Sequence, residues 1–368
     1  MTVLLWILGI LAAPPLIFAL WLVWVFFKEL FFAGHDVGNA AGRKAAEKLG
    51  LLPAGQLDAE SPGPLPAEWR AALAKAREGE WQTPAALLRG IGRDWGRRYL
   101  AVSCLGDLVA EDDAWLVAWE TACPGDPDAA VVRAQGTVRL AWRRRGGKRA
   151  KYTSGKQFDG FHRTLVRARD EIAKAAELNP DDPTPHAVEI WVALGLGYPR
   201  ATMATLWAQT VARDPYHYGA HFAALQYWCE KWRGSERLAM DFAERAAAGA
   251  PPGSLLTALP LIAQFEHKES EDKDADNTPE MVARVDAGLI DAAAADPANP
   301  ALPELRHLLA FYLSRQDRHE MAIEQFRLVD GYVGALPWFY YAKGTRAAYY
   351  CRARNASASA AAAAKVEG

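Results

Sequence analysis

Cysteine is scarce in this chain, and none of it is arranged for chemistry. The 368 residues include four cysteines, and no two of them form a C-x-x-C pair. The sequence therefore excludes a zinc ribbon and gives no sign of a disulfide framework. We expect all four to be buried free thiols, namely Cys104, Cys123, Cys229 and Cys351.

An excess of charge of one sign is also missing. The chain has 42 lysines and arginines against 44 aspartates and glutamates, so its formal net charge of −2 provides no bulk attraction for nucleic acid. A G-x-S-x-G elbow, a P-loop and a dinucleotide fingerprint are absent as well. These absences favour a protein that is not an enzyme, and we expect no cofactor and no nucleic-acid partner.

Residues 2–27 contain no charged residue at all. As a helix these 26 residues would extend about 39 Å, which exceeds the roughly 30 Å hydrocarbon core of a bilayer. A signal peptide would need a basic start and a shorter apolar run, whereas the first basic residue here is Lys28. The sequence thus predicts an uncleaved transmembrane anchor over residues 1–30, kinked at Pro14 and Pro15.

The basic residues near this segment predict its orientation. Lys28, Arg43, Lys44 and Lys48 lie on its C-terminal side, while only the α-amino group is positive on the other side. Positive residues favour the cytoplasmic side of a span. The sequence therefore predicts a single-pass protein of the cell membrane whose C-terminal domain is cytoplasmic.

A small or acidic residue followed by proline recurs along the rest of the chain and divides it into helical hairpins. The steps are 53, 35, 36 and 46 residues apart, and two of them are close to the 34-residue period of one class of helical repeat. A proline at such a step ends one helix, and the next helix begins a few residues later. The steps are Asp126-Pro127, Asn179-Pro180, Asp214-Pro215, Ala250-Pro251 and Asp296-Pro297.

Two half-motifs within this region are similar to those of the tetratricopeptide repeat family. Trp191, Leu194, Gly195 and Tyr198 match the W-x2-L-G-x2-Y half-motif, and Ala322 with Phe326 matches the A-x3-F half-motif. The resemblance covers roughly residues 126–330, and Pro215 follows Trp191 sooner than the family pattern expects. The chain also resembles a group of uncharacterised bacterial proteins with degenerate repeats, a likeness that implies no activity.

What the repeat family implies is a stack of helical hairpins whose concave face holds a peptide or another protein. The predicted fold is therefore all-α, with the N-terminal transmembrane helix followed by an α-solenoid of antiparallel, tetratricopeptide-like hairpins. We divide the chain into the anchor (1–30), a juxtamembrane helix with a proline-rich linker (31–66), the helical repeat domain (67–354) and a low-complexity tail (355–368).

The stretch 214–232, DPYHYGAHFAALQYWCEKW, concentrates polar and aromatic residues in one place. His217 and His221 are four residues apart, so they would share a helical face and are weak candidates for metal ligands. A third ligand is not evident, and the same residues fit ordinary packing and capping of a repeat helix. If the concave groove binds a partner, we expect the contacts to include His217, Tyr218, His221 and Tyr227.

Two further segments have strongly biased charge. Residues 142–156 contain seven basic residues and no acid, which fits a solvated loop or a contact with anionic lipid or an acidic partner. Residues 265–280 are rich in acid but lack the calcium-loop pattern, so we expect a flexible insertion. The basic candidates are Arg143, Arg144, Arg145, Lys148, Arg149 and Lys151.

The hypothesis that these features favour is a membrane-anchored helical-repeat scaffold that binds a protein or peptide at the cytoplasmic face. One alternative is a metal-binding enzyme or sensor that uses His217 and His221. Another is a structural subunit of a larger membrane assembly.

Overall fold

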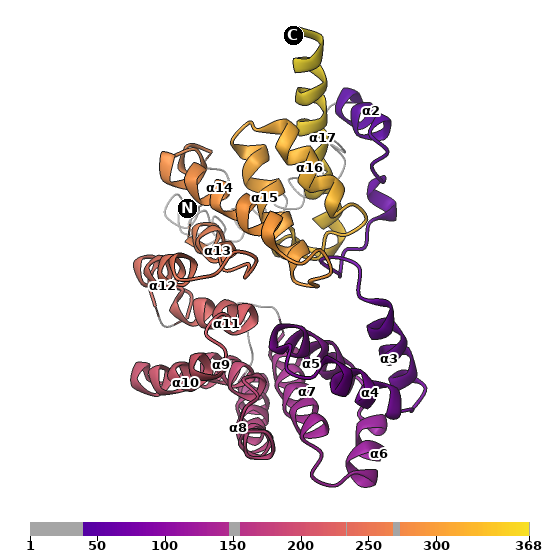
Figure 1. Cartoon of the computed structure of the whole chain (residues 1–368), viewed down its shortest axis with the longest axis vertical. Helices are drawn as coiled ribbons and strands as arrows, with labels where there is room; N and C mark the ends of the chain where they lie inside the picture. The colour runs from indigo at the N-terminus through magenta and orange to yellow at the C-terminus, as the bar shows by residue number, and fades with distance from the viewer. Residues whose placement is uncertain (1–39, 147–154, 233, 268–272, 368) are drawn as a thin grey trace, which may run out of the picture.

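The computed structural model describes residues 40–146, 155–232, 234–267 and 273–367, and this part of the chain is helical (Figure 1). Its only β-type contact is an isolated bridge between Asp58 and Tyr332. The predicted all-α class is therefore confirmed. The sixteen α-helices of the described part are α2 (Ala40–Lys48), α3 (Ala67–Arg77), α4 (Gln82–Ile91), α5 (Trp95–Val109), α6 (Ala114–Ala122), α7 (Pro127–Arg145), α8 (Gly155–Leu178), α9 (Thr184–Leu196), α10 (Arg200–Arg213), α11 (Tyr218–Trp228), α12 (Glu236–Ala248), α13 (Ala258–His267), α14 (Pro279–Ala294), α15 (Leu302–Arg315), α16 (His319–Leu328) and α17 (Lys343–Glu367).

The predicted transmembrane helix requires a correction. Across the described stretches, no helix is both long enough and apolar enough to cross a membrane. The two longest, α8 and α17, carry charged residues at intervals along their length, and such residues are costly inside a bilayer. This finding overturns the prediction of a single-pass protein of the cell membrane for the part of the chain that the structure describes. Residues 2–27, on which that prediction rests, lie outside the described residues.

The acid–proline steps act in two ways. At the first step, Asp126 caps α7, because its Oδ1 accepts the backbone N–H of Asp128 at 2.8 Å and Pro127 takes the first helical position. At Asp214 the step instead ends α10, and α11 begins only at Tyr218. The proline steps therefore mark where helices are interrupted more reliably than where the next helix begins.

The helices from α9 to α16 form two layers. α9, α11, α13 and α15 contact one another in sequence, and α10, α12, α14 and α16 pack against them (Figure 1). The links within the α9–α10 and α15–α16 pairs are short, at residues 197–199 and 316–318, so the two helices of each pair fold back on one another. This packing is compatible with a helical-repeat protein.

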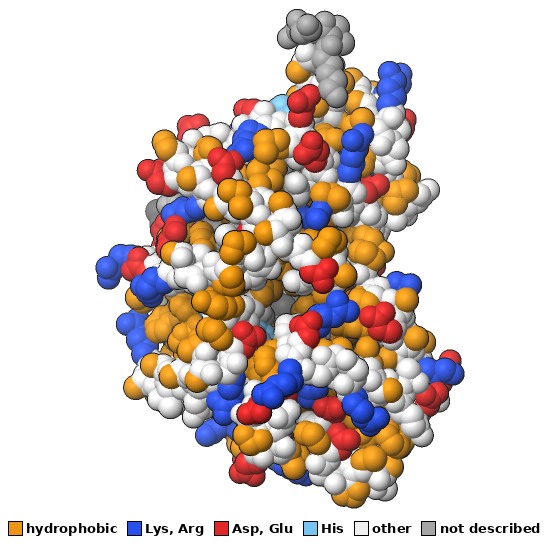
Figure 2. Space-filling view, in the orientation of Figure 1, with side chains coloured by type: hydrophobic (Ala, Val, Ile, Leu, Met, Phe, Trp, Pro, Cys, Tyr) orange, Lys and Arg blue, Asp and Glu red, His pale blue; other side chains and the backbone are white. Residues whose placement is uncertain are grey.

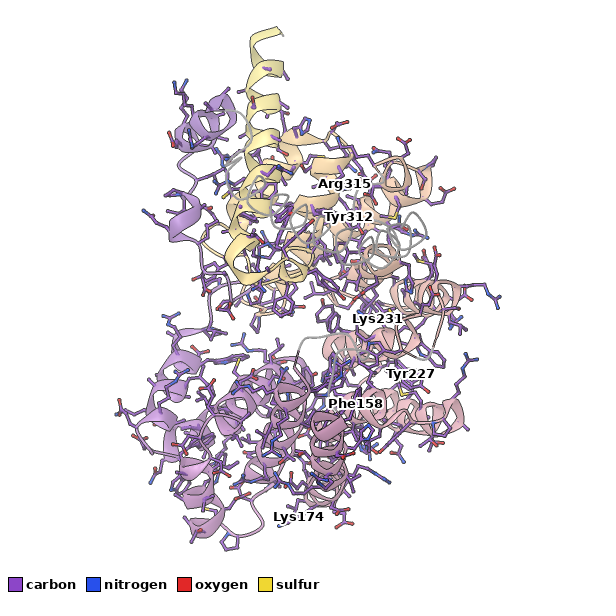
Figure 3. The ribbon with its side chains drawn as sticks, turned by 180° about the vertical axis from the view of Figure 1, so that it is seen from behind. Phe158, Lys174, Tyr227, Lys231, Tyr312 and Arg315 are labelled. Atoms are coloured by element: carbon purple, nitrogen blue, oxygen red, sulfur yellow. The ribbon has the colours of Figure 1, made fainter. Side chains whose placement is uncertain are left out.

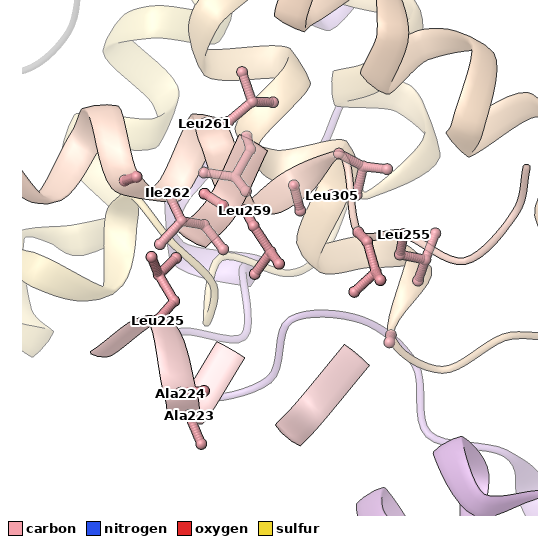
Figure 4. Close-up of a cluster of buried hydrophobic side chains, with 14 of the residues drawn as sticks. Ala223, Ala224, Leu225, Leu255, Leu259, Leu261, Ile262 and Leu305 are labelled. Atoms are coloured by element: carbon pink, nitrogen blue, oxygen red, sulfur yellow. The ribbon is translucent and has the colours of Figure 1, made fainter. Parts of the chain in front are cut away.

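The core consists of one large and one smaller hydrophobic cluster. The smaller cluster lies among the helices from α3 to α8, and the large one extends from α7 to α17 and includes Ala46 of α2 and Tyr99 of α5. Figure 4 shows a part of the large cluster where Ala223, Ala224 and Leu225 of α11 meet Leu259 of α13 and Leu305 of α15. Burial of these apolar side chains holds the inner layer together.

Residues 51–63, which include part of the expected proline-rich linker, pack against the C-terminal helices. The backbone of Asp58 bonds to Gly331 and Val333, each at 2.8 Å, to form the isolated bridge. His307 on α15 donates from Nε2 to the carbonyl of Pro62 at 2.9 Å, and its Nδ1 accepts the indole N–H of Trp338 at 3.2 Å. This segment therefore fastens the N-terminal part of the described chain to its C-terminal part.

The segment expected as a low-complexity tail is helical as far as Glu367, because α17 continues through it. Asn355, Ser357 and Ala358 are buried, and the Ser357 hydroxyl donates to that of Ser314 at 3.0 Å. α2 packs closely across the same part of α17.

A buried ion-pair network joins the N-terminal helices to the layered helices. Arg98 of α5 donates from Nε to Asp182 at 2.7 Å and from Nη2 to Asp128 of α7 at 2.6 Å. Asp182 also accepts the backbone N–H of Thr184 at 2.8 Å, at the start of α9. The side chains of Arg98 and Asp182 are 3% and 1% exposed, so three helices meet at one desolvated charge pair.

We predict that Arg98→Met lowers the free energy of unfolding by about 3–5 kcal/mol, because it leaves the carboxylate of Asp182 buried without a cation. Urea unfolding followed by circular dichroism measures the change. The control is Arg93→Met, which removes an exposed pair with Asp181 whose side chains are 73% and 67% exposed. That variant should lose no more than about 1 kcal/mol, and equal losses in the two variants would contradict the prediction.

Candidate functional site

The stretch 214–232 forms a turn and then α11, and it separates two hollows of the surface. Asp214 closes the turn by accepting the backbone N–H of Tyr216 at 3.1 Å. His217 then caps α11, because its Nδ1 accepts the N–H of Ala220 at 3.1 Å. A histidine is therefore the N-cap residue of α11.

The first hollow, which we call the inner cavity, has a volume of about 250 Å³ and lies where α5, α11 and α15 begin. Figure 2 shows the surface hollowed between the half that contains α5 and α11 and the half that contains α15. His217 and Tyr218 line it together with Arg97, Tyr99 and other residues. The rings of His217 and Tyr99 meet edge to face, with centroids 5.1 Å apart.

Most polar groups of the inner cavity are already bonded to the protein. Tyr218 donates its hydroxyl to Glu304 at 3.0 Å, and burial raises the pKa of both groups. Arg97 donates to the carbonyl of Ala298 at 3.1 Å. Burial lowers the pKa of His217, so its ring is neutral and its proton resides on Nε2, since Nδ1 is an acceptor. The inner cavity thus lies where helices pack together, and most of its polar groups are used in contacts within the protein.

The second hollow, which we call the aromatic groove, lies between α10 and α12 with α11 at its floor. Its volume is about 400 Å³, within the range of ligand-binding pockets. Hydrophobic side chains gather over α10 and α12 at the left edge of Figure 2. The groove is lined chiefly by Trp207, Pro215, Tyr216, Trp228, Phe242 and Arg245.

His221 forms part of the groove floor. Its ring meets that of Trp207 edge to face, with centroids 4.8 Å apart. Its Nδ1 lies 3.0 Å from the carbonyl oxygen of His217, and because a carbonyl only accepts, this nitrogen carries the proton. Burial lowers the pKa of His221 to about 4, so Nε2 presents a lone pair at neutral pH.

One pair of rings in the aromatic groove follows the spacing of the proline steps. Trp207 on α10 and Phe242 on α12 are 35 residues apart, which equals the separation of the steps at Asn179 and Asp214. The two rings pack with centroids 5.3 Å apart. Sequence reasoning missed this pair, although the 35-residue offset places both aromatics at the same position of consecutive hairpins.

The charge of the aromatic groove comes from one residue. Among its described lining residues, Arg245 is the only one with a permanent charge. This side chain is exposed, and no ion pair joins it to another described residue. Sequence reasoning missed Arg245 as well, because a single arginine on an amphipathic helix does not by itself indicate a binding site.

The other two predicted partner contacts lie elsewhere. Tyr227 is fully buried in α11, where its hydroxyl donates to the carbonyl of Tyr198 at 2.7 Å (Figure 3). Tyr218 faces the inner cavity. Of the four residues predicted to bind a partner, only His221 lines the aromatic groove.

The geometry brings no further metal ligand to His217 and His221. The Nδ1 atom of each ring is engaged with backbone, at Ala220 and at His217. Within the described stretches, no group of three or more His, Cys, Asp or Glu residues could hold a metal ion. Cys229 is buried, and burial raises the pKa of its thiol to about 12.

The described residues of the basic segment contact the protein itself. Arg143 pairs with Glu111 at 3.1 Å, and Arg144 donates to the hydroxyl of Thr164 at 2.9 Å. The guanidinium of Arg145 lies over the rings of Trp142 and Trp232, 5.6 and 5.5 Å from their centroids. The predicted contacts Lys148, Arg149 and Lys151 lie outside the described residues.

We predict that the chain loses stability as the pH falls from about 6.5 toward 4, in part because His221 must be buried uncharged. Its folded pKa of about 4 lies below the unfolded value of roughly 6.5, so protons bind preferentially to the unfolded chain in this window. His221 alone should account for on the order of 2 kcal/mol at pH 4. Urea unfolding at a series of pH values measures the loss.

The control is His221→Asn, which keeps a donor near the position of Nδ1 but does not titrate. Its stability should fall less steeply over the same pH window. An unchanged slope would contradict the prediction.

No protein-family model matches this chain, and no curated protein or solved structure matches it either. A function for the chain therefore has to come from its own contacts, burial and charge.

Proposed function

We propose that the chain is a tetratricopeptide-like scaffold that binds a peptide segment of another protein in the aromatic groove. The observation that carries this proposal is the groove itself, which collects large apolar rings on the surface between two successive hairpins. Tyr216 at its border is 43% exposed, so the groove is open to solvent beside a large aromatic side chain.

The packing of the half-motif residues supports the tetratricopeptide-like interpretation. A Cβ atom at Gly195 would lie 2.3 Å from Cδ1 of Leu165, so any side chain here would displace that of Leu165 where α8 and α9 approach. Trp191 donates its indole N–H to Tyr99 at 3.1 Å, which connects α9 to α5. Ala322 and Phe326 are fully buried, as small and large packing positions of a second helix should be.

The energetics of the groove also favour a peptide ligand. Burial of one large apolar side chain is worth about 1.5–3 kcal/mol, and aromatic pairs add to this. Peptides that place such anchors in a hydrophobic groove are a common ligand of helical scaffolds. One or two anchors would suffice for weak, reversible recruitment.

The proposal is tested by selecting peptides from a random phage-displayed library on the immobilised full chain and measuring their affinities by fluorescence anisotropy. We predict that Ala204→Arg weakens the selected peptides by roughly 10–100-fold, because the long side chain would fill the groove that Ala204 lines.

The matched control is Thr202→Arg, which introduces the same side chain at an exposed position of α10 outside the groove. That variant should bind as the parent chain does. Failure to select any peptide, or equal loss in both variants, would refute the proposal.

A further inference from the structure

The aromatic groove also indicates what kind of peptide it fits. Resting on the function proposed above, we infer that its ligand is an extended acidic segment, which places an apolar side chain among Trp207, Trp228 and Phe242 and a carboxylate on Arg245.

Charge complementarity is the first argument for an acidic partner. Arg245 is exposed in the last turn of α12, without an ion pair to any described residue. A guanidinium at this position would form a bidentate ion pair with a carboxylate. On the same helix, Glu244 already pairs with Arg284 at 2.7 Å, and Asp241 does not line the groove.

The opposite wall of the groove carries no acid. The charged residues of α10 are Arg200 at its first position and Arg213 at its last. Between them the exposed residues are small or neutral, namely Ala201, Thr202, Ala204, Thr205, Ala208, Gln209 and Ala212. An acidic segment lying along α10 would therefore meet no like charge from this helix, whereas a basic segment would meet an arginine at either end.

Hydrogen-bonding groups of the groove suit the backbone of an extended peptide. The indole N–H groups of Trp207 and Trp228, two residues that line the groove, have no hydrogen-bond partner among the described residues and could donate to peptide carbonyls. The Nε2 lone pair of His221 is the complementary acceptor for a peptide N–H. An extended segment offers both kinds of group, while a helix has already bonded its own to one another.

The test uses the full chain and three fluorescein-labelled synthetic peptides that share one leucine–phenylalanine anchor. The residues flanking this anchor are glutamates in the first peptide, glutamines in the second and lysines in the third. We predict that the glutamate peptide binds about tenfold more tightly than the glutamine peptide, that the lysine peptide binds most weakly, and that added salt reduces the differences. Arg245→Glu should reverse the preference between glutamate and lysine.

The matched control is Arg237→Glu, which makes the same change of charge at an exposed position of α12 outside the groove. It should keep the preference for glutamate. Equal affinities for the three peptides, or a reversal by Arg237→Glu as well, would overturn the inference.

Failure of this inference is distinguishable from failure of the proposed function. If library peptides bind and Ala204→Arg blocks them, but acidic flanks give no advantage, the groove binds peptides of another class. If no library peptide binds, the proposed function itself is refuted.

Discussion

The buried contact between Arg98 and the carboxylates of Asp182 and Asp128 is the constraint on which the arrangement of helices depends. It joins α5, α7 and the start of α9, although these residues are far apart in the sequence. A charge pair that is almost fully desolvated tolerates little displacement, because either ion alone would be very costly to bury. The N-terminal helices are therefore held in one position against the layered helices, and Tyr99, the next residue of α5, contacts both Trp191 and His217.

The spacing of the proline steps recurs in the surface proposed to bind a partner. Because consecutive hairpins are offset by 35 residues, Trp207 and Phe242 stand side by side and open a groove above α11. The aromatic groove thus contains two rings at this spacing, while Arg245 and His221 give it a charge and a lone pair. The inner cavity on the other side of α11 differs in kind, since Tyr218 is bonded to Glu304 of α15 and Arg97 to the backbone of Ala298.

Much of the helical architecture was predictable, and the candidate site only in part. Helix-forming composition and the proline steps predict helices and their interruptions, because both act through local backbone geometry. The spacing of His217 and His221 predicted a shared face, but His217 precedes the helix as its cap, so the two rings line different hollows. Tyr227 was expected at a groove and is buried instead, because Tyr198 from the preceding hairpin accepts its hydroxyl hydrogen. The prediction of a membrane protein was wrong for the described part of the chain, because its long helices carry too many charges to cross a membrane.

The sequence by itself determined the helical class, the points where the proline steps interrupt helices and the 35-residue offset, since each follows from local propensity or from the order of residues. Only the tertiary structure decided which aromatic side chains line a groove and which form the core. The packing of residues 51–63 against α15 and α17 could not be predicted from the sequence either, because the pattern of a proline-rich stretch does not indicate which helices it packs against. Such contacts form between residues hundreds of positions apart, where shape and desolvation, rather than local pattern, select the pairing.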